Sequence, residues 1–172
     1  TSEVEHVLST QTLLTKPAKN FLINFNGKLG KGITSKDIIL HLIGKIGTAG
    51  GTGYVFEYAG SVIENLSIEE RMTICNMSIE AGARAGLINP DHKTFNYLKN
   101  KPLVPKNENW NEAISYWESF KSDKDASYDK TLSINATEIE PQVTWGTSPE
   151  DVVTINSKIP DPDDFKNTEK KK

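Results

Sequence analysis

Hydrophobic and polar positions along the chain follow two periods, one typical of helices and one typical of strands. Phe21, Ile23 and Phe25 alternate with Leu22, Asn24 and Asn26, which predicts a strand. Apolar residues recur every three or four positions over residues 34–46, which predicts a helix. The same patterns predict further helices at 1–12, 66–86, 94–99 and 110–120, and further strands at 54–58, 132–136 and 139–145. This alternation favours an α/β fold with a mixed or mostly parallel sheet flanked by helices.

The helix predicted at residues 66–86 has signals at both ends. Ser67 and Glu70 have the spacing of a capping box, in which each side chain accepts a hydrogen bond from the other residue's backbone N–H group. Gly86 predicts the end of the helix. Apolar residues three or four positions apart predict the face that packs inward: Ile68, Met72, Cys75 and Ile79.

Two polar residues, Asn76 and Glu80, lie beside this apolar face. They are four positions apart, so on a helix both side chains point in the same direction and form a small polar wall. The spacing alone favours an ordinary role, in which a half-exposed amide and carboxylate bond to a neighbouring turn. A catalytic pair is the alternative that the spacing leaves open.

The glycine-rich residues 47–53 have the composition of a phosphate-binding loop but the wrong neighbours. Phosphate loops connect a strand to the N-terminus of a helix, whereas here the predicted helix comes first and the strand follows. This order argues against nucleotide binding. It predicts instead a turn with positive φ angles, through which the end of a helix reverses into a strand.

Aromatic residues are concentrated in the helix predicted at 110–120, at Trp110, Trp117 and Phe120. Such a stripe can serve as a cofactor site or as a stacking platform for nucleic acid. At helical spacing it more commonly forms part of a core or a domain interface, and we predict that role here.

Composition and charge exclude several classes of protein. Hydrophobic residues make up 36% and charged residues 25% of the 172 residues, which is ordinary for a globular protein. The formal net charge of −3 predicts no general attraction to nucleic acid or to an anionic membrane. The single cysteine, Cys75, excludes an internal disulfide and a cysteine-ligated metal cluster formed by one copy of the chain. It suits a reducing compartment. Because no targeting segment is in view, we expect a cytoplasmic protein.

Five blocks of sequence, in this order, resemble the aconitase superfamily: TSEVEHV, TSKDIIL, GGTG, CNMSIEAGARAG and TWGTSPEDVV. The spelling of the fourth block is closest to the large subunit of isopropylmalate isomerase (3-isopropylmalate dehydratase). In that block an Asn and a Glu four residues apart line the active site of the family. The resemblance implies α/β/α domains and assigns those two positions to Asn76 and Glu80.

The activity that the resemblance implies is that of a hydro-lyase with a 4Fe-4S cluster. Such an enzyme dehydrates the hydroxy-acid 2-isopropylmalate and rehydrates the alkene to 3-isopropylmalate, a step of leucine biosynthesis. Glu80 would hydrogen-bond to the departing hydroxyl or help to protonate it. Asn76 would orient substrate or water near the cluster without being a ligand. A homoaconitase or aconitase-type hydro-lyase is the alternative within the family, and a non-catalytic interaction domain is the alternative outside it.

The chain lacks the cysteines with which the family binds its cluster. The three cysteines that ligate the family's cluster lie beyond this sequence, and Cys75 matches none of them. We therefore expect an internal fragment that binds no cluster, acts with remaining domains or a separate small subunit, and is inactive alone. The expected organisation is the end of a preceding domain at 1–30, an α/β domain carrying Asn76 and Glu80 at 31–156, and a linker or cut end at 157–172.

Overall fold

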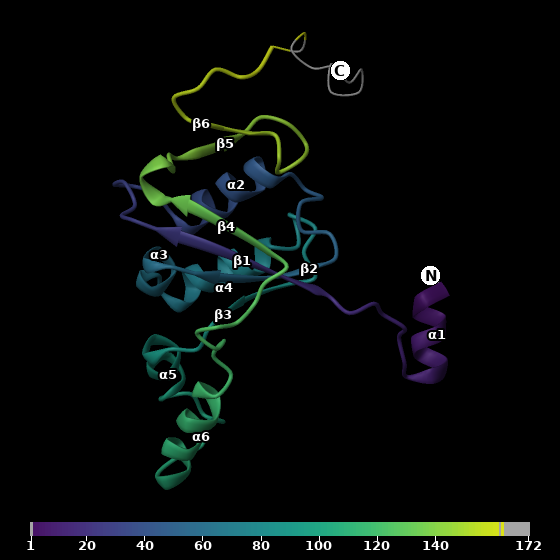
Figure 1. Cartoon of the computed structure of the whole chain (residues 1–172), viewed down its shortest axis with the longest axis vertical. Coiled ribbons are helices and arrows are strands. Elements are labelled where there is room, and N and C mark those ends of the chain that lie inside the picture. The colour runs from purple at the N-terminus through teal and green to yellow at the C-terminus, as the bar shows by residue number, and fades with distance from the viewer. Residues whose placement is uncertain (1, 162, 164–172) are drawn as a thin grey trace.

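A four-stranded parallel sheet forms the centre of the computed structural model, which describes residues 2–161 and 163 (Figure 1). The strands lie in the order β3-β2-β1-β4. Their bounds are β1 Lys19–Asn26, β2 Tyr54–Ala59, β3 Ala85–Ile88 and β4 Lys130–Asn135. The predicted α/β fold with a mostly parallel sheet is confirmed. The sheet includes strands from both sides of the domain boundary predicted at residue 30, and the division into domains stays a prediction.

Helices connect the strands because parallel neighbours need a crossover connection. Helix α2 (Ser35–Ile46) joins β1 to β2, and α3 (Ser61–Asn65) with α4 (Ile68–Met77) joins β2 to β3. Thr34 and Asp37 form the capping box of α2. One face of the sheet and these helices share a hydrophobic core, whose fully buried members include Phe21, Ile23, Phe25, Ile38, Ile39, Leu42, Ile43, Phe56 and Ile74.

The other face of the sheet is only partly covered by irregular chain. Leu22, Glu57 and Leu87 lie side by side on it in neighbouring strands. The hydroxyl of Ser122 donates a hydrogen bond of 2.7 Å to the Glu57 carboxylate. Leu87 at the edge of this face is 55% exposed. None of the helices within residues 2–161 combines the length and apolar character needed to cross a membrane.

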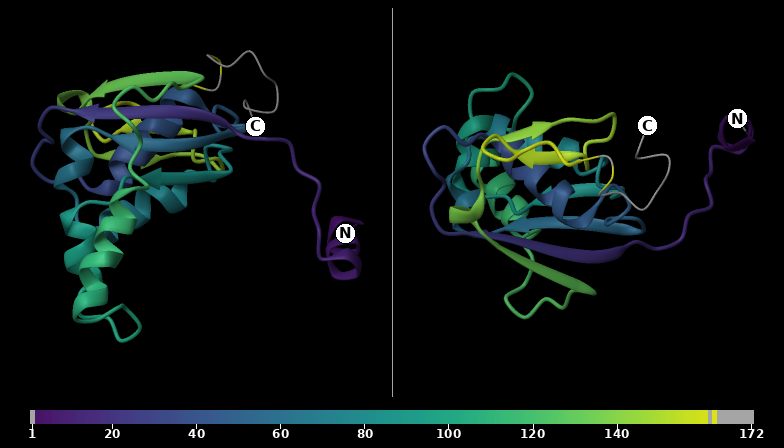
Figure 2. Two further views of the ribbon diagram at one scale, coloured as in Figure 1. Left: turned by 60° about the horizontal axis from the view of Figure 1, so that its bottom comes forward. Right: turned by 90° about the horizontal axis from the view of Figure 1, so that it is seen from above.

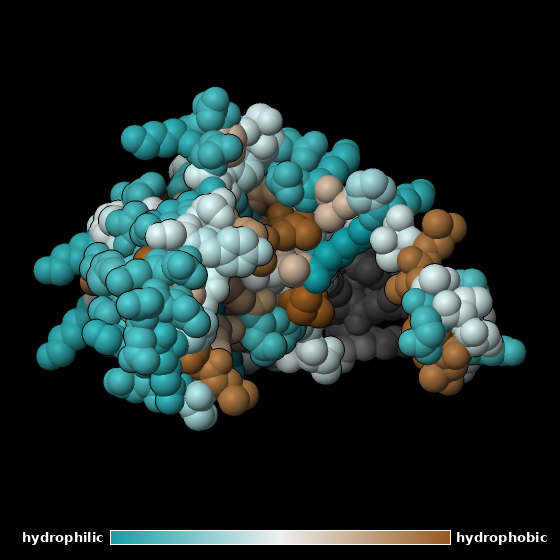
Figure 3. Space-filling view, turned by 90° about the horizontal axis from the view of Figure 1, so that it is seen from below, coloured by the Kyte–Doolittle hydropathy of each residue, from teal (hydrophilic) through white to brown (hydrophobic). Residues whose placement is uncertain are grey.

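Three helices lie outside the main core. Helix α1 (Ser2–Thr10) stands apart from the sheet at the end of an extended segment (Figures 1 and 2), and Figure 3 shows its exposed apolar side chains. Helices α5 (His92–Leu98) and α6 (Glu108–Glu118) extend beyond the β3 edge of the sheet. Trp117 of α6 stacks on Phe95 of α5 at 6.1 Å between ring centroids, yet no α6 residue is buried. The prediction of a core role for this aromatic helix is wrong, and an interface role stays a prediction.

The helix predicted at residues 66–86 is wrong in its second half. The capping box of Ser67 and Glu70 is confirmed, but α4 ends at Met77 and a turn over residues 78–84 leads into β3, which contains Gly86. The reason lies at Ser78, which is fully buried. Its hydroxyl lies 3.0 Å from the carbonyl of Ile74 and 2.7 Å from the hydroxyl of Tyr58, so the side chain ties the end of the helix to the sheet.

The inward face predicted for this helix is also wrong. Met72 and Ile79 are 51% and 56% exposed, whereas Arg71, Ile74 and Ser78 are buried. The apolar pattern misses this face because two of its three members are polar and pair with partners on other elements. The actual inward face is therefore rotated by about one residue, or 100°, around the helix.

The glycine-rich residues 47–53, here called the glycine loop, connect α2 to β2 as predicted. Positive φ angles occur at Gly47 (78°) and Gly53 (83°), which confirms the predicted turn. The N–H group of Gly51 donates a hydrogen bond of 2.8 Å to the carbonyl of Ala81 in the turn after α4. A final hairpin of β5 (Gln142–Thr144) and β6 (Val152–Thr154), which follows the short 3-10 helix η1 (Ala136–Glu138), packs against α2 (Figure 2).

We predict that Gly51→Ala destabilises the fold by about 1–3 kcal/mol, because an added methyl group overpacks a rigid contact. A Cβ at Gly51 would clash with the ring of Phe56 and lie 2.9 Å from the backbone nitrogen of Ala83. Gly30→Ala is the matched control, since a Cβ there would meet only Ile33, at 3.7 Å. Chemical denaturation of both variants measures the difference, and equal free energies of unfolding would contradict the prediction.

Candidate active site

Glu80 lies in the turn after α4 and lines an open pocket of about 330 Å³. Three segments form this pocket. Lys36 and Leu40 come from the first half of α2, Met77 and Glu80 come from the end of α4 and its turn, and the rest comes from Thr144 and the hairpin loop of residues 146–149. The pocket thus joins parts of the chain that are far apart in sequence.

The lining of this pocket combines charged, hydroxyl and apolar groups. Lys36 lies in the first turn of α2, where the helix dipole already contributes positive potential. Within the described residues, neither the Lys36 ammonium nor the Glu80 carboxylate has an oppositely charged group within 4.0 Å. Thr147 and Ser148 add hydroxyl groups, and Leu40, Met77 and Pro149 add apolar surface. The pocket therefore places cationic, anionic, hydroxyl and apolar groups around one open space.

Asn76 lies in the last turn of α4, close in sequence to this pocket but not in its lining. Its side chain is exposed, as is that of Glu80. The four-residue spacing does not place the two residues on one helical face, because the helix ends at Met77 between them. The structure therefore brings Glu80 into the pocket and leaves Asn76 on the adjoining surface.

Lys36 and the hairpin loop are components of the pocket that the sequence pattern did not indicate. Lys36 lies between Ser35 and the capping residue Asp37, so its sequence context indicates only the start of a helix. No periodic signal links it to Glu80 or to Ser148. Only the packing of the hairpin on α2 brings these residues to one place.

Comparison with known protein families bears on the chain as a whole. A family model described as the aconitase family (aconitate hydratase) matches residues 1–172. The chain belongs to the aconitase family. Membership indicates a function of the hydro-lyase type, and aconitase-family proteins generally bind a 4Fe-4S cluster.

The residues present do not fit such a cluster. A 4Fe-4S cluster is held by several cysteine thiolates, and this sequence has one cysteine. Burial raises the pKa of the Cys75 thiol to about 11, although the positive charge of Arg71 partly offsets this, so the thiolate is disfavoured. Within the described residues no three His, Cys, Asp or Glu side chains form a group that could hold a metal ion.

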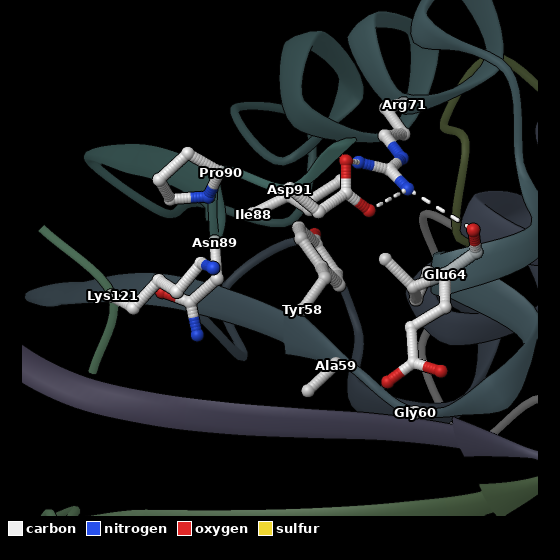
Figure 4. A pocket seen from close by; sticks show the side chains of 11 residues that line it. Tyr58, Ala59, Gly60, Glu64, Arg71, Ile88, Asn89, Pro90, Asp91 and Lys121 are labelled. Carbon is white, nitrogen blue, oxygen red and sulfur yellow. Dashed lines mark hydrogen bonds and ion pairs between the residues drawn. The ribbon is translucent and has the colours of Figure 1, made fainter. Parts of the chain in front are cut away.

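A second cavity of about 170 Å³ lies at the carboxyl ends of β2 and β3 of this aconitase-family chain (Figure 4). The buried Arg71 guanidinium donates to both carboxylate oxygens of Asp91, at 2.9 and 2.6 Å, and to the carbonyl of Glu64 at 3.1 Å. The Asn89 amide donates to Glu57 at 3.0 Å. Apart from the buried Nε of Arg71, which has no partner among the described residues, these polar groups bond to neighbouring protein groups, so we assign this cavity a structural role.

Asp91 also caps helix α5, so its carboxylate accepts hydrogen bonds from the start of that helix as well as from Arg71. Burial by itself would raise the pKa of the Asp91 carboxyl, but hydrogen bonds from Arg71 and from the N–H group of Thr94 outweigh it and lower the pKa to about 2. The ion pair and the cap together fix α5 on α4.

We predict that Asp91→Asn destabilises the fold by about 2–4 kcal/mol, because it leaves the buried charge of Arg71 without its partner. Glu118→Gln is the control, since the Glu118–Lys121 pair is about half exposed and should change the free energy of unfolding by less than about 1 kcal/mol. Urea denaturation at neutral pH gives both values, and equal small effects would contradict the prediction.

The pH dependence provides an independent readout of the same pair. A carboxyl whose pKa is lower in the folded state stabilises the protein above its unfolded pKa of 3.8, and this contribution disappears as the pH falls toward 2. The wild-type chain should therefore lose more stability between pH 4 and about 2 than Asp91→Asn does. Parallel pH profiles of the two proteins would argue against the ion pair.

Proposed function

We propose that this chain forms part of the active site of a hydro-lyase that isomerises 2-isopropylmalate to 3-isopropylmalate, a step of leucine biosynthesis. The observation that carries the proposal is the position of Glu80, whose carboxylate lines an open pocket beside Lys36 and has no hydrogen-bond partner among the described side chains. The spelling of the block around Asn76 and Glu80, which is closest to isopropylmalate isomerase, supports this substrate over aconitate.

The chemistry requires help at the substrate hydroxyl, because hydroxide is a poor leaving group. In our proposal Glu80 hydrogen-bonds to this hydroxyl and supplies a proton as the carbon–oxygen bond breaks, so that water departs. In the rehydration step the same carboxylate accepts a proton from the attacking water. Asn76 orients the substrate or the water from the adjoining surface. The base that removes the carbon-bound proton is not assigned to this chain.

The pocket offers complementary groups for the parts of the proposed substrate. 2-Isopropylmalate carries two carboxylates, a hydroxyl and a branched alkyl group. The Lys36 ammonium suits a carboxylate, and the apolar surface of Leu40, Met77 and Pro149 suits the alkyl group. This match supports a hydroxy-acid as the substrate class.

In this proposal the cluster is held by protein outside the 172 residues, because one cysteine cannot ligate it. When bound, the cluster would supply a Lewis acid for the substrate oxygens. The partners are remaining domains or a separate small subunit, together with the small hydroxy-acid. No nucleic acid or membrane is involved.

We predict that Glu80→Gln lowers kcat for 2-isopropylmalate by about 10²- to 10⁴-fold in the complete, cluster-loaded enzyme, because the amide cannot transfer a proton. Glu69→Gln is the matched control, an exposed carboxylate at the other end of α4. The iron and sulfide content of each purified variant checks that both are equally loaded. A kcat for Glu80→Gln within twofold of the control would refute the role of Glu80.

The substrate assignment needs a separate comparison. The complete enzyme should have a higher kcat/KM for 2-isopropylmalate than for citrate or homocitrate. A preference for either tricarboxylate would move the assignment to an aconitase or homoaconitase and leave the role of Glu80 intact.

The isolated 172-residue chain should not isomerise 2-isopropylmalate, because it has too few cysteines to hold a cluster. Incubation of the purified chain with iron, sulfide and substrate tests this, with the complete enzyme as the positive control. Steady formation of 3-isopropylmalate by the chain alone would contradict the proposed dependence on other domains.

A further inference from the structure

The pocket around Glu80 has two walls that lie on either side of Lys36 and Leu40 of α2. One wall contains Glu80 itself, in the turn after α4, and the other is the hairpin loop of residues 146–149. The glycine loop hydrogen-bonds to the residue that follows each wall in the sequence, which is Ala81 after Glu80 and Glu150 after Pro149. Its contacts, together with the packing of both walls on α2, therefore fix the distance between them.

Toward the hairpin, the glycine loop is clamped by a carboxylate. The N–H group and the hydroxyl of Thr48 both donate hydrogen bonds to Oε2 of Glu150, at 3.0 and 2.9 Å. Glu150 directly follows Pro149, a residue of the pocket wall. Hydrogen bonds to an ionised carboxylate are stronger than neutral ones, so this clamp is a firm attachment of the hairpin tip.

Toward Glu80, the same loop is fixed by its backbone. The N–H group of Gly51 donates a hydrogen bond of 2.8 Å to the carbonyl of Ala81, the residue after Glu80. Ala81 is fully buried, and a Cβ at Gly82 would lie 2.6 Å from the carbonyl oxygen of Thr48. The glycine loop and this turn therefore have little room to shift relative to each other.

The base of the hairpin has a separate anchor. The N–H group of Gln142 at the start of β5 donates a hydrogen bond of 2.8 Å to Oδ1 of Asp37 in α2. Further along, Val152 of β6 packs directly against Gly44 of α2. Asp37 thus fixes the end of the hairpin away from the loop, and Glu150 fixes the end that lines the pocket.

We propose that Thr48 and Glu150 are positioning residues, whose hydrogen bonds hold the hairpin wall at the distance from Glu80 that the substrate requires. This inference rests on the proposed function, since it takes Glu80 as the group that acts on the substrate. Neither residue lines the pocket, so both act through the walls. A displacement of about 1 Å in a catalytic site can cost two orders of magnitude in rate, which makes such a clamp important.

Steady-state kinetics of the complete, cluster-loaded enzyme test the clamp. Thr48→Val keeps the shape of the side chain and removes its hydrogen bond to Glu150, and it should raise KM for 2-isopropylmalate by about tenfold. Thr48→Ser keeps the hydroxyl and should have a KM within about twofold of wild type. A purely structural role would lower the amount of active enzyme and leave KM unchanged, because KM does not depend on the folded fraction.

Two further variants keep the test decisive. Thr73→Val removes a hydroxyl that bonds to Glu69 within α4 at 3.1 Å, remote from the clamp, and should leave KM unchanged. Glu150→Gln weakens the clamp from the other side and should raise KM by about threefold. If Thr48→Val does not fold, the KM of Glu150→Gln tests the positioning role in its place. A wild-type KM in the clamp variants, or an equal KM for Thr48→Ser and Thr48→Val, would overturn the inference.

The two hypotheses fail in different ways. If Glu80→Gln abolishes turnover while the clamp variants keep a wild-type KM, the proposed function is supported and the positioning role of Thr48 and Glu150 is refuted. If Glu80→Gln retains full activity, the proposed function is refuted, and so is the positioning role of Thr48 and Glu150 that rests on it.

Discussion

The close contact between the glycine loop and the turn after α4 is the constraint on which the pocket depends. Gly51 lies where a side chain would collide with Phe56, so its backbone can approach the carbonyl of Ala81 to 2.8 Å. This contact fixes the turn that ends α4 and begins β3. Since Glu80 belongs to that turn, the direction of its side chain follows from a packing requirement of the fold.

Buried polar groups fix the remaining geometry of α4. Ser78 ties the end of the helix to Tyr58 in the sheet, and Arg71 ties its middle to Asp91 at the start of α5. An unpaired buried charge or hydroxyl is costly, so each of these pairs permits few alternative positions of the helix. The result is a helix whose inward side combines Arg71 and Ile74, followed by a turn in which Ser78 is buried and Glu80 is exposed.

The sequence pattern predicted the parts of the fold that local interactions determine. Strand β1, helix α2 and the turn of the glycine loop are all confirmed. The end of α4 is predicted too late because residues 78–81 contain no glycine or proline, whereas the buried contacts of Ser78 and the glycine loop end the helix before Gly82, whose φ is 84°. Local propensity is overridden here by tertiary contacts.

The candidate site was predictable in part for the same reason. Glu80 and Asn76 were indicated by a resemblance carried by neighbouring residues, and their roles stay a prediction. Lys36, Thr48 and Glu150 had no local signal, because each acquires its place only when the hairpin packs on α2 and the glycine loop. Residues that meet through long-range packing leave no period in the sequence.

The central claim is that Glu80 acts on the substrate hydroxyl, and a crystal structure of the complete enzyme with bound 2-isopropylmalate tests it most directly. The distance from the nearer Glu80 carboxylate oxygen to the hydroxyl oxygen is the quantity to measure. Our account predicts hydrogen-bond contact, at about 2.6–3.2 Å or through one bridging water. A substrate bound elsewhere, with Glu80 facing solvent, would contradict it.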